Sequence, residues 1–393
     1  MTAQWENKFV DDWSVQVPSH VTYHCQNQNF YLDSKHTMHI AILFVSLVLV
    51  LPTICYAQDA QVQWSNLTKE ATRLRHEGKY DQALEVAEKA LKIAEEKTGL
   101  PNEALVLVLD DLGNIYEAKK DFVQAETYKL RALAIWEKGL GPENPQFLDI
   151  LDNVASYYLY VTKEHAKAET LYKRALAISE KIHGVNHFLT LDQLKDLDLL
   201  YVMQNDAAKA EPYKKRILEI QEKHLGSDHP YVIHSLWSLA TTYCYQKEFA
   251  KAEALFLRSV AGAEKVHGPD HPKTALILRY LAQMYDAKGD PVKAEPLHTR
   301  SLAILEKHHG EEHEEVAGCL IDMSKHYKLI KKYDLAIPLM KRSLAILEKT
   351  SGSESHHLID PLEQLAEMYR ANKRVDEAQA LEQRIARIRS LKK

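Results

Sequence analysis

Apolar residues in the second half of the chain follow the spacing of helices that bury one face. Between residues 230 and 246 they lie three or four positions apart, with one adjacent pair: Val232, Leu236, Leu239, Ala240 and Tyr243. After a short polar turn, a second set has the same kind of spacing: Phe249, Ala252, Leu255, Phe256 and Val260. Each set lies along one face of a helix. The pattern therefore predicts a hairpin of two antiparallel helices.

This hairpin repeats along the chain. Alanine recurs at Ala83, Ala125, Ala168, Ala210, Ala252, Ala294, Ala336 and Ala378. Tyrosine recurs at Tyr116, Tyr158, Tyr201, Tyr243, Tyr285, Tyr327 and Tyr369, a series that we call the tyrosine ladder. Both series step by 42 residues, with one step of 43 whose extra residue lies between Tyr158 and Ala168, where we expect a turn. One hairpin cannot bury its apolar face alone, so a fixed period predicts stacked units.

The residues between the predicted helices and the composition of the chain agree with a helical fold. A glycine that can take a left-handed cap ends each unit, as Gly268 does, and a proline such as Pro272 begins the next helix. Only 13 glycines and 13 prolines occur in 393 residues, too few for the many tight turns of a β-sandwich or barrel. We therefore predict an all-α solenoid of about eight helix-turn-helix repeats over residues 58–393.

The repeat resembles the tetratricopeptide repeat. The first helix carries Leu239-Ala240 and Tyr243, and the second carries Phe249 and Ala252 with a second small residue, Ser259. The 42-residue form is similar to the kinesin light chain type, as the stretches 168–178 and 226–230 and the prolines Pro212, Pro296 and Pro338 indicate. The resemblance implies a right-handed superhelix whose first helices line a concave groove that binds peptides or partner domains.

The resemblance also implies which residues face that groove, namely those five and two positions before each ladder tyrosine. The candidate groove residues are Asp111, Asn114, Asn153, Ser156, Asp196, Ser238, Thr241, Tyr280, Gln283, Asp322, Lys325 and Gln364. Their polarity fits hydrogen bonding to a bound peptide, and it fits equally a first-helix face that is simply solvated. The asparagine pair typical of light chains is mostly replaced, for example by Asp110-Asp111, so we expect a different ligand preference.

Charge narrows the class of partner. The formal net charge of −5 gives no overall basic field for a nucleic-acid backbone, so no nucleic-acid partner is expected. Acidic residues gather in the first helices of the N-terminal repeats: Asp110, Asp111, Asp149, Asp152, Asp192 and Asp196. This concentration predicts a protein or peptide partner that carries lysine or arginine near that end.

The sequence offers no catalytic motif and no expected cofactor. Nucleophile-elbow, zinc-protease, phosphate-loop and Cys-x-x-Cys patterns are absent, which favours a binding scaffold over an enzyme. The loop histidines His187, His229, His271 and His313 keep the repeat period, which sets them too far apart to share a metal, so we expect helix-entry residues and no metal site. Cys244 and Cys319 are expected to be unpaired, and the tyrosine ladder is expected to be core.

The first 57 residues lack the repeat. Residues 1–37 are expected to be a disordered extension, which precedes the true start if translation begins at Met38. An apolar run of twelve, Ile40–Leu51, is short for a bilayer span and fits a signal peptide over residues 38–57, cleaved between Ala57 and Gln58. An uncleaved anchor through residues 40–57 and a buried apolar segment are the alternatives. An exported (periplasmic or secreted) scaffold is thus expected, with a membrane-tethered assembly component or a cytosolic adaptor like kinesin light chain as alternatives.

Overall fold

The computed structural model describes residues 59–96, 100–139 and 144–391, and this part of the chain contains helices and no strand. The expected extension over residues 1–37 and the expected signal peptide over residues 38–57 lie outside it. None of the helices described has the length and apolar character needed to traverse a lipid bilayer.

The described helices pair into eight antiparallel hairpins, as the period predicts. In chain order the first and second helices of each pair are the helix over 59–76 with α2 (Tyr80–Glu95), α3 (Asn102–Ala118) with α4 (Phe122–Gly139), α5 (Gln146–Ser156) with α6 (His165–His183), α7 (Leu191–Met203) with α8 (Ala207–Leu225), α9 (Pro230–Tyr245) with α10 (Phe249–His267), α11 (Pro272–Lys288) with α12 (Pro291–His309), α13 (Glu314–Leu329) with α14 (Tyr333–Ser351), and α15 (Ile359–Ala371) with α16 (Val375–Ser390).

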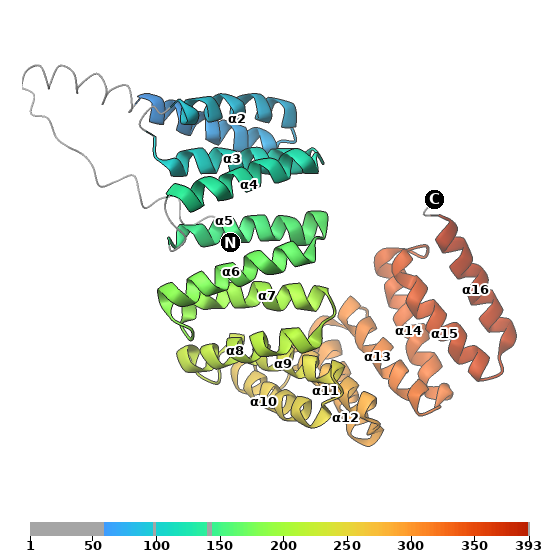
Figure 1. The fold of residues 1–393 in the computed structure, drawn as a ribbon. Helices are drawn as coiled ribbons and strands as arrows, with labels where there is room; N and C mark the ends of the chain where they lie inside the picture. The colour runs from blue at the N-terminus through green and yellow to red at the C-terminus, as the bar shows by residue number, and fades with distance from the viewer. Residues whose placement is uncertain (1–58, 97–99, 140–143, 392–393) are drawn as a thin grey trace, which may run out of the picture.

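The hairpins follow one another in a single curved row, so that each contacts the next (Figure 1). The row runs from α2 to α8, turns through α9–α12, and continues in a new direction through α13–α16. The fold is the all-α, right-handed superhelical solenoid that the sequence predicts. Short 3-10 turns, Phe188–Thr190 and His356–Leu358, lead into α7 and α15.

The core is built from the two periodic series. The recurring alanines are fully buried, which lets the two helices of a hairpin approach closely. The ladder tyrosines from Tyr158 onward are buried, and Tyr116 is half-buried. Five ladder hydroxyls donate to a glutamate in the second helix of the preceding repeat, a contact that ties neighbouring units together. The pairs are Tyr158–Glu126 (2.7 Å), Tyr201–Glu169 (2.9 Å), Tyr243–Glu211 (3.2 Å), Tyr285–Glu253 (2.8 Å) and Tyr327–Glu295 (2.8 Å).

The extra residue of the 43-residue unit does not fall in the turn where we expected it. It lies in the first helix, whose last part, Tyr157–Thr162, is a π-helix. The N–H of Glu164 donates to the carbonyl of Tyr158 six positions earlier, whereas the N–H of Glu248 donates to Tyr243 five positions earlier. A wider helical turn accommodates an inserted residue without moving the following helix out of register.

Each first helix is followed, within two residues of its end, by a residue with positive φ. From the third hairpin onward this residue is Lys163, Asn205, Lys247, Gly289, Lys331 or Lys373, with φ between 57° and 83°. The glycine that ends a second helix behaves differently from the left-handed cap that we expected. Gly268 has φ 102° and ψ 156°, a region that is essentially reserved for glycine. The period of glycines therefore reflects this backbone requirement.

Candidate functional site

Hollows open between successive first helices, with a second helix as the floor. One, of about 420 Å³, lies between α7 and α9 over α8. Another, of about 290 Å³, extends from α9 towards α11. The two share the lining residues Lys214 and Ser238 and so adjoin each other across three repeats, and together we call them the central groove.

Lys214, on α8, is a buried cation at the floor of the central groove. Its Nζ donates to Asp198 Oδ2 at 2.8 Å and to Ser238 Oγ at 2.7 Å. Burial raises the pKa of the Asp198 carboxyl, and the charge and hydrogen bond of Lys214 oppose that rise. The lysine is thus neutralised by the fold and does not by itself attract an acidic ligand.

An aromatic pair forms one wall of the central groove. The rings of Trp237 on α9 and Tyr280 on α11 lie 4.9 Å apart, centroid to centroid. The indole Nε1–H of Trp237 is buried and has no acceptor among the described residues. The planar apolar surface of the two rings suits packing against an extended peptide.

A third hollow, of about 230 Å³, lies in the corresponding place between α3 and α5 over α4. Its lining includes the carboxylates of Glu103, Asp110 and Asp149 beside Trp136 and Asn153. The N-terminal repeats therefore present a depression of the same kind, with acidic walls.

Six acidic residues stand on the first helices α3, α5 and α7, and we call them the acidic strip: Asp110, Asp111, Asp149, Asp152, Asp192 and Asp196. Asp110 and Asp149 line the α3–α5 hollow. The pKa of Asp111 rises to about 6, mainly through burial, with the charge of the neighbouring Asp110 as the next cause. Burial also raises the pKa of Asp152 to about 7, with the charge of Asp196 as the next cause. The pKa of Asp196 rises to about 6, again mainly through burial.

Most of the strip makes no ion pair within the described part of the chain, although the charges of Arg75 and Lys129 oppose the rise in the pKa of Asp111. Asp110 lies 3.8 Å from Lys129, and Asp192 lies 2.9 Å from Lys195. No lysine, arginine or histidine among the described residues lies within ion-pair distance of the other four carboxylates. Half-buried carboxylates that raise each other's pKa are poised to accept a positive charge from a partner.

The structure brings several of the predicted groove residues to these hollows. Ser238, Thr241 and Tyr280 line the central groove, and Asn153 lines the α3–α5 hollow. Asp111 and Asp196 are half-buried members of the acidic strip.

Other predicted residues are occupied inside the fold. Asn114 accepts from Lys129 at 2.5 Å, and Ser156 lies 3.1 Å from the Tyr172 hydroxyl. Asp322 differs most from the expectation, because it is buried and accepts two hydrogen bonds from Arg279.

The remaining candidates lie outside the hollows. Gln283 and Lys325 are exposed, and Gln364 is half-buried with an unpartnered Oε1. The predicted residues that line a hollow therefore stand on α5, α9 and α11.

Sequence reasoning missed Lys214 and the wall residue Trp237. The repeat register could have indicated Trp237. The residue six positions before the ladder tyrosine lines a hollow in three repeats, as Asp110, Lys195 and Trp237. Counting five and two positions back overlooked that register. Lys214 stands on a second helix at a position occupied by Phe256 in the next repeat, so the period suggested an apolar residue.

The remaining sequence expectations concern histidines and cysteines. The loop histidines are helix N-caps, as expected of helix-entry residues: each Nδ1 accepts from the N–H two positions later, at 3.1–3.2 Å. Cys244 and Cys319 are free thiols, as predicted.

The chain is similar to several solved structures. The putative kinesin light chain repeats of Podosopora anserina are 25% identical, with a TM-score of 0.47, and the match covers 52% of this chain and 97% of that chain. The apo form of RapI is 14% identical with a TM-score of 0.50, covering 72% and 97%. The quorum sensor NprR of B. thuringiensis is 13% identical with a TM-score of 0.49, covering 83% and 87%.

A comparison with curated protein sequences finds no match. The profile of the tetratricopeptide repeat family, in contrast, matches six overlapping segments: residues 71–138, 103–180, 146–223, 199–265, 231–307 and 288–349. Together they cover well over half of the chain, in the register of the helical hairpins. The chain belongs to the tetratricopeptide repeat family.

Proposed function

We propose that this solenoid is a non-catalytic scaffold that holds an extended segment of a partner protein along its first helices. The central groove supplies an aromatic wall, and the acidic strip supplies charge. Members of this fold class bind peptide or protein partners, so the chemistry of the first-helix face decides which partner fits.

The acidic strip is the observation that best supports this proposal. Burying a carboxylate without a cation is unfavourable, and here the raised pKa values of Asp111, Asp152 and Asp196 express that cost. A partner that places lysine or arginine side chains over α3, α5 and α7 removes the cost and gains charge-assisted hydrogen bonds. We therefore propose a basic segment over the N-terminal repeats, continuing into the central groove.

Selection from a random-peptide display library against the full chain tests this proposal. We expect the enriched peptides to contain lysine or arginine, and to be lost when the triple variant Asp111→Asn, Asp152→Asn and Asp196→Asn replaces the unmodified chain. These substitutions keep the side-chain shape and remove only charge. Enrichment of acidic or uncharged peptides, or unchanged capture by the triple variant, would overturn it.

We also propose that residues 38–57 direct export and are removed, so that the scaffold works outside the cytoplasm. The uncharged run Ile40–Leu51 supports this proposal. Mass spectrometry of the mature chain is expected to find Gln58 at the N-terminus. Recovery of residues 38–57 in the membrane fraction would favour a tether, and a cytosolic chain that keeps them would favour an adaptor.

A further inference from the structure

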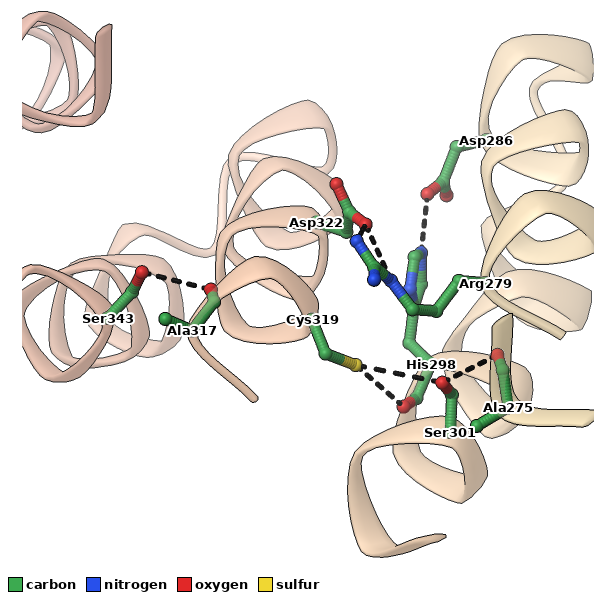
Figure 2. A network of polar contacts seen from close by, with 9 residues as sticks. All are labelled: Ala275, Arg279, Asp286, His298, Ser301, Ala317, Cys319, Asp322 and Ser343. Atoms are coloured by element: carbon green, nitrogen blue, oxygen red, sulfur yellow. Dashed lines mark hydrogen bonds and ion pairs between the residues drawn. The ribbon is translucent and has the colours of Figure 1, made fainter. Parts of the chain in front are cut away.

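One buried cluster of metal-ligating side chains lies outside the first-helix hollows. Asp286 at the end of α11, His298 on α12 and His326 on α13 meet where two successive repeats touch. Asp286 Oδ2 lies 2.9 Å from His298 Nε2, and Asp286 Oδ1 lies 2.6 Å from His326 Nδ1. Figure 2 shows Asp286 and His298 pointing toward each other beside the Arg279–Asp322 ion pair.

Both histidine side chains are completely enclosed, whereas Asp286 keeps 15% of its side chain exposed. The neighbouring repeats fill the histidine positions with apolar residues. Phe256 and Met340 correspond to His298, and Met284 and Met368 correspond to His326. Two imidazoles in this part of the core are therefore a local departure from the repeat, and packing alone does not require them.

Hydrogen bonding to Asp286 satisfies only half of each ring. Nδ1 of His298 and Nε2 of His326 are buried and have no partner among the described residues. An unpaired buried polar atom is unfavourable, and each ring would pack better as the apolar residue that its neighbours carry. The nitrogens that converge on Asp286 are the two hydrogen-bonded ones, so three candidate ligand atoms lie together at a place where apolar residues would pack better.

We propose that Asp286, His298 and His326 bind one divalent transition-metal ion, with Zn²⁺ as the best match. Two imidazole nitrogens and one carboxylate oxygen form a donor set that suits zinc. The three candidate ligand atoms lie within 4.8 Å of one another. Ligands of a tetrahedral zinc are separated by roughly 3.4 Å, so a shift of several tenths of an ångström at each ligand admits the ion.

Binding exchanges the two N–H···O hydrogen bonds for three metal–ligand bonds. His298 then coordinates through Nε2 and carries its proton on Nδ1, while His326 coordinates through Nδ1 and carries its proton on Nε2. The exposed edge of Asp286 leaves a fourth position open to water. The ion joins α11, α12 and α13, and so fixes two consecutive repeats in the region where the row of hairpins turns (Figure 1).

Metal titration of the full chain after treatment with a chelator tests the site. We expect about one Zn²⁺ per chain by calorimetry, a rise in Tm on adding Zn²⁺, and the visible absorption of tetrahedral Co²⁺ when cobalt replaces zinc. His298→Phe and His326→Met insert the residues that neighbouring repeats already use, so their cores are expected to fold. Each variant is expected to lose the stoichiometric metal and the zinc-dependent rise in Tm.

A surface histidine group provides the matched control. His271 has the rings of His267 and His308 at 5.0 Å and 6.1 Å, and His271→Asn keeps a capping side chain while removing one imidazole. This variant is expected to bind metal like the unmodified chain. Absence of stoichiometric binding in the unmodified chain, a cobalt spectrum without tetrahedral bands, or binding that survives His298→Phe but is lost in His271→Asn would each overturn the proposal.

Discussion

At the scale of single residues, five ladder tyrosines, from Tyr158 to Tyr327, combine a buried ring with a directed hydrogen bond to a glutamate. The glutamate that accepts it stands directly after the recurring alanine, which gives a physical reason for the Ala-Glu pair at the start of the second helix. Hydrogen bonds from Lys288 and then Tyr285 lower the pKa of Glu253 to about 2, so the acceptor stays ionised under ordinary conditions.

Tyr285→Phe isolates this hydrogen bond. The variant keeps the ring and removes the hydroxyl that donates to Glu253, so we expect a loss of about 1 kcal/mol in the free energy of unfolding. Tyr369→Phe is the control, because Tyr369 is equally buried and its hydroxyl makes no hydrogen bond within the described part of the chain. Urea unfolding of both variants measures the difference, and equal losses would assign the effect to packing.

The acidic strip predicts an unusual dependence of stability on pH. Asp111, Asp152 and Asp196 lose their protons near pH 4 in the unfolded chain and only near pH 6 to 7 in the folded chain. The folded state binds more protons in this window, so these groups make the free energy of unfolding fall as pH rises through it.

The triple Asp→Asn variant at positions 111, 152 and 196 checks this sign. We expect it to be more stable than the unmodified chain at pH 8, with the advantage shrinking towards pH 4, where the aspartates are protonated in both states. The midpoints of urea unfolding, measured for both chains from pH 4 to pH 8, test this expectation. An advantage that is constant with pH would mean that the three carboxylates are not desolvated.

At the scale of elements, the helices and their order follow from the apolar stripes because both signals are local. The π-helix at Tyr157–Thr162 could not be predicted, since the spacing shows that one residue is extra but not which element absorbs it. The ion pair between Arg279 and Asp322 was missed for a related reason. The two residues lie 43 positions apart, and the family resemblance implied that Asp322 faced the groove.

The ends of the first helices give a prediction at this scale. Lys331 has φ 60°, a conformation that costs a residue with a side chain about 1 kcal/mol relative to glycine, and Gly289 stands at the same position of another repeat. We expect Lys331→Gly to raise the free energy of unfolding by roughly 0.5–1 kcal/mol and Gly289→Lys to lower it. Thermal or urea unfolding measures both, and a loss of stability in Lys331→Gly would show that the lysine side chain contributes more than the strain.

At the scale of the whole molecule, a row of hairpins stabilises itself through contacts between neighbours. The repeat count and the pairing of helices were predictable from the period. The hollows were predictable only in part, because their walls combine side chains from three repeats, as Lys214, Ser238 and Tyr280 do in the central groove. The relative placement of repeats depends on packing that a single unit does not specify.

Local stability follows from this architecture. Tyr243→Ala in a middle repeat is expected to cost about 3–5 kcal/mol, confined to its neighbourhood and able to divide unfolding into two transitions. Tyr369→Ala is expected to loosen only the last repeat. Hydrogen exchange read along the chain distinguishes these patterns. Equal loss of protection over the whole chain in both variants would indicate one cooperative core instead of a solenoid.

The affinity of a selected basic peptide is the measurement that tests the proposed scaffold most directly. It compares the unmodified chain with the triple Asp→Asn variant and with a control that removes three exposed charges from second helices: Glu88→Gln, Glu219→Gln and Asp376→Asn. We predict that the triple Asp→Asn variant binds the peptide roughly ten- to a hundredfold more weakly and that the control binds it unchanged. Added salt is expected to narrow the difference in affinity. An equal loss of affinity in both variants, or no loss in the triple Asp→Asn variant, would contradict binding at the acidic strip.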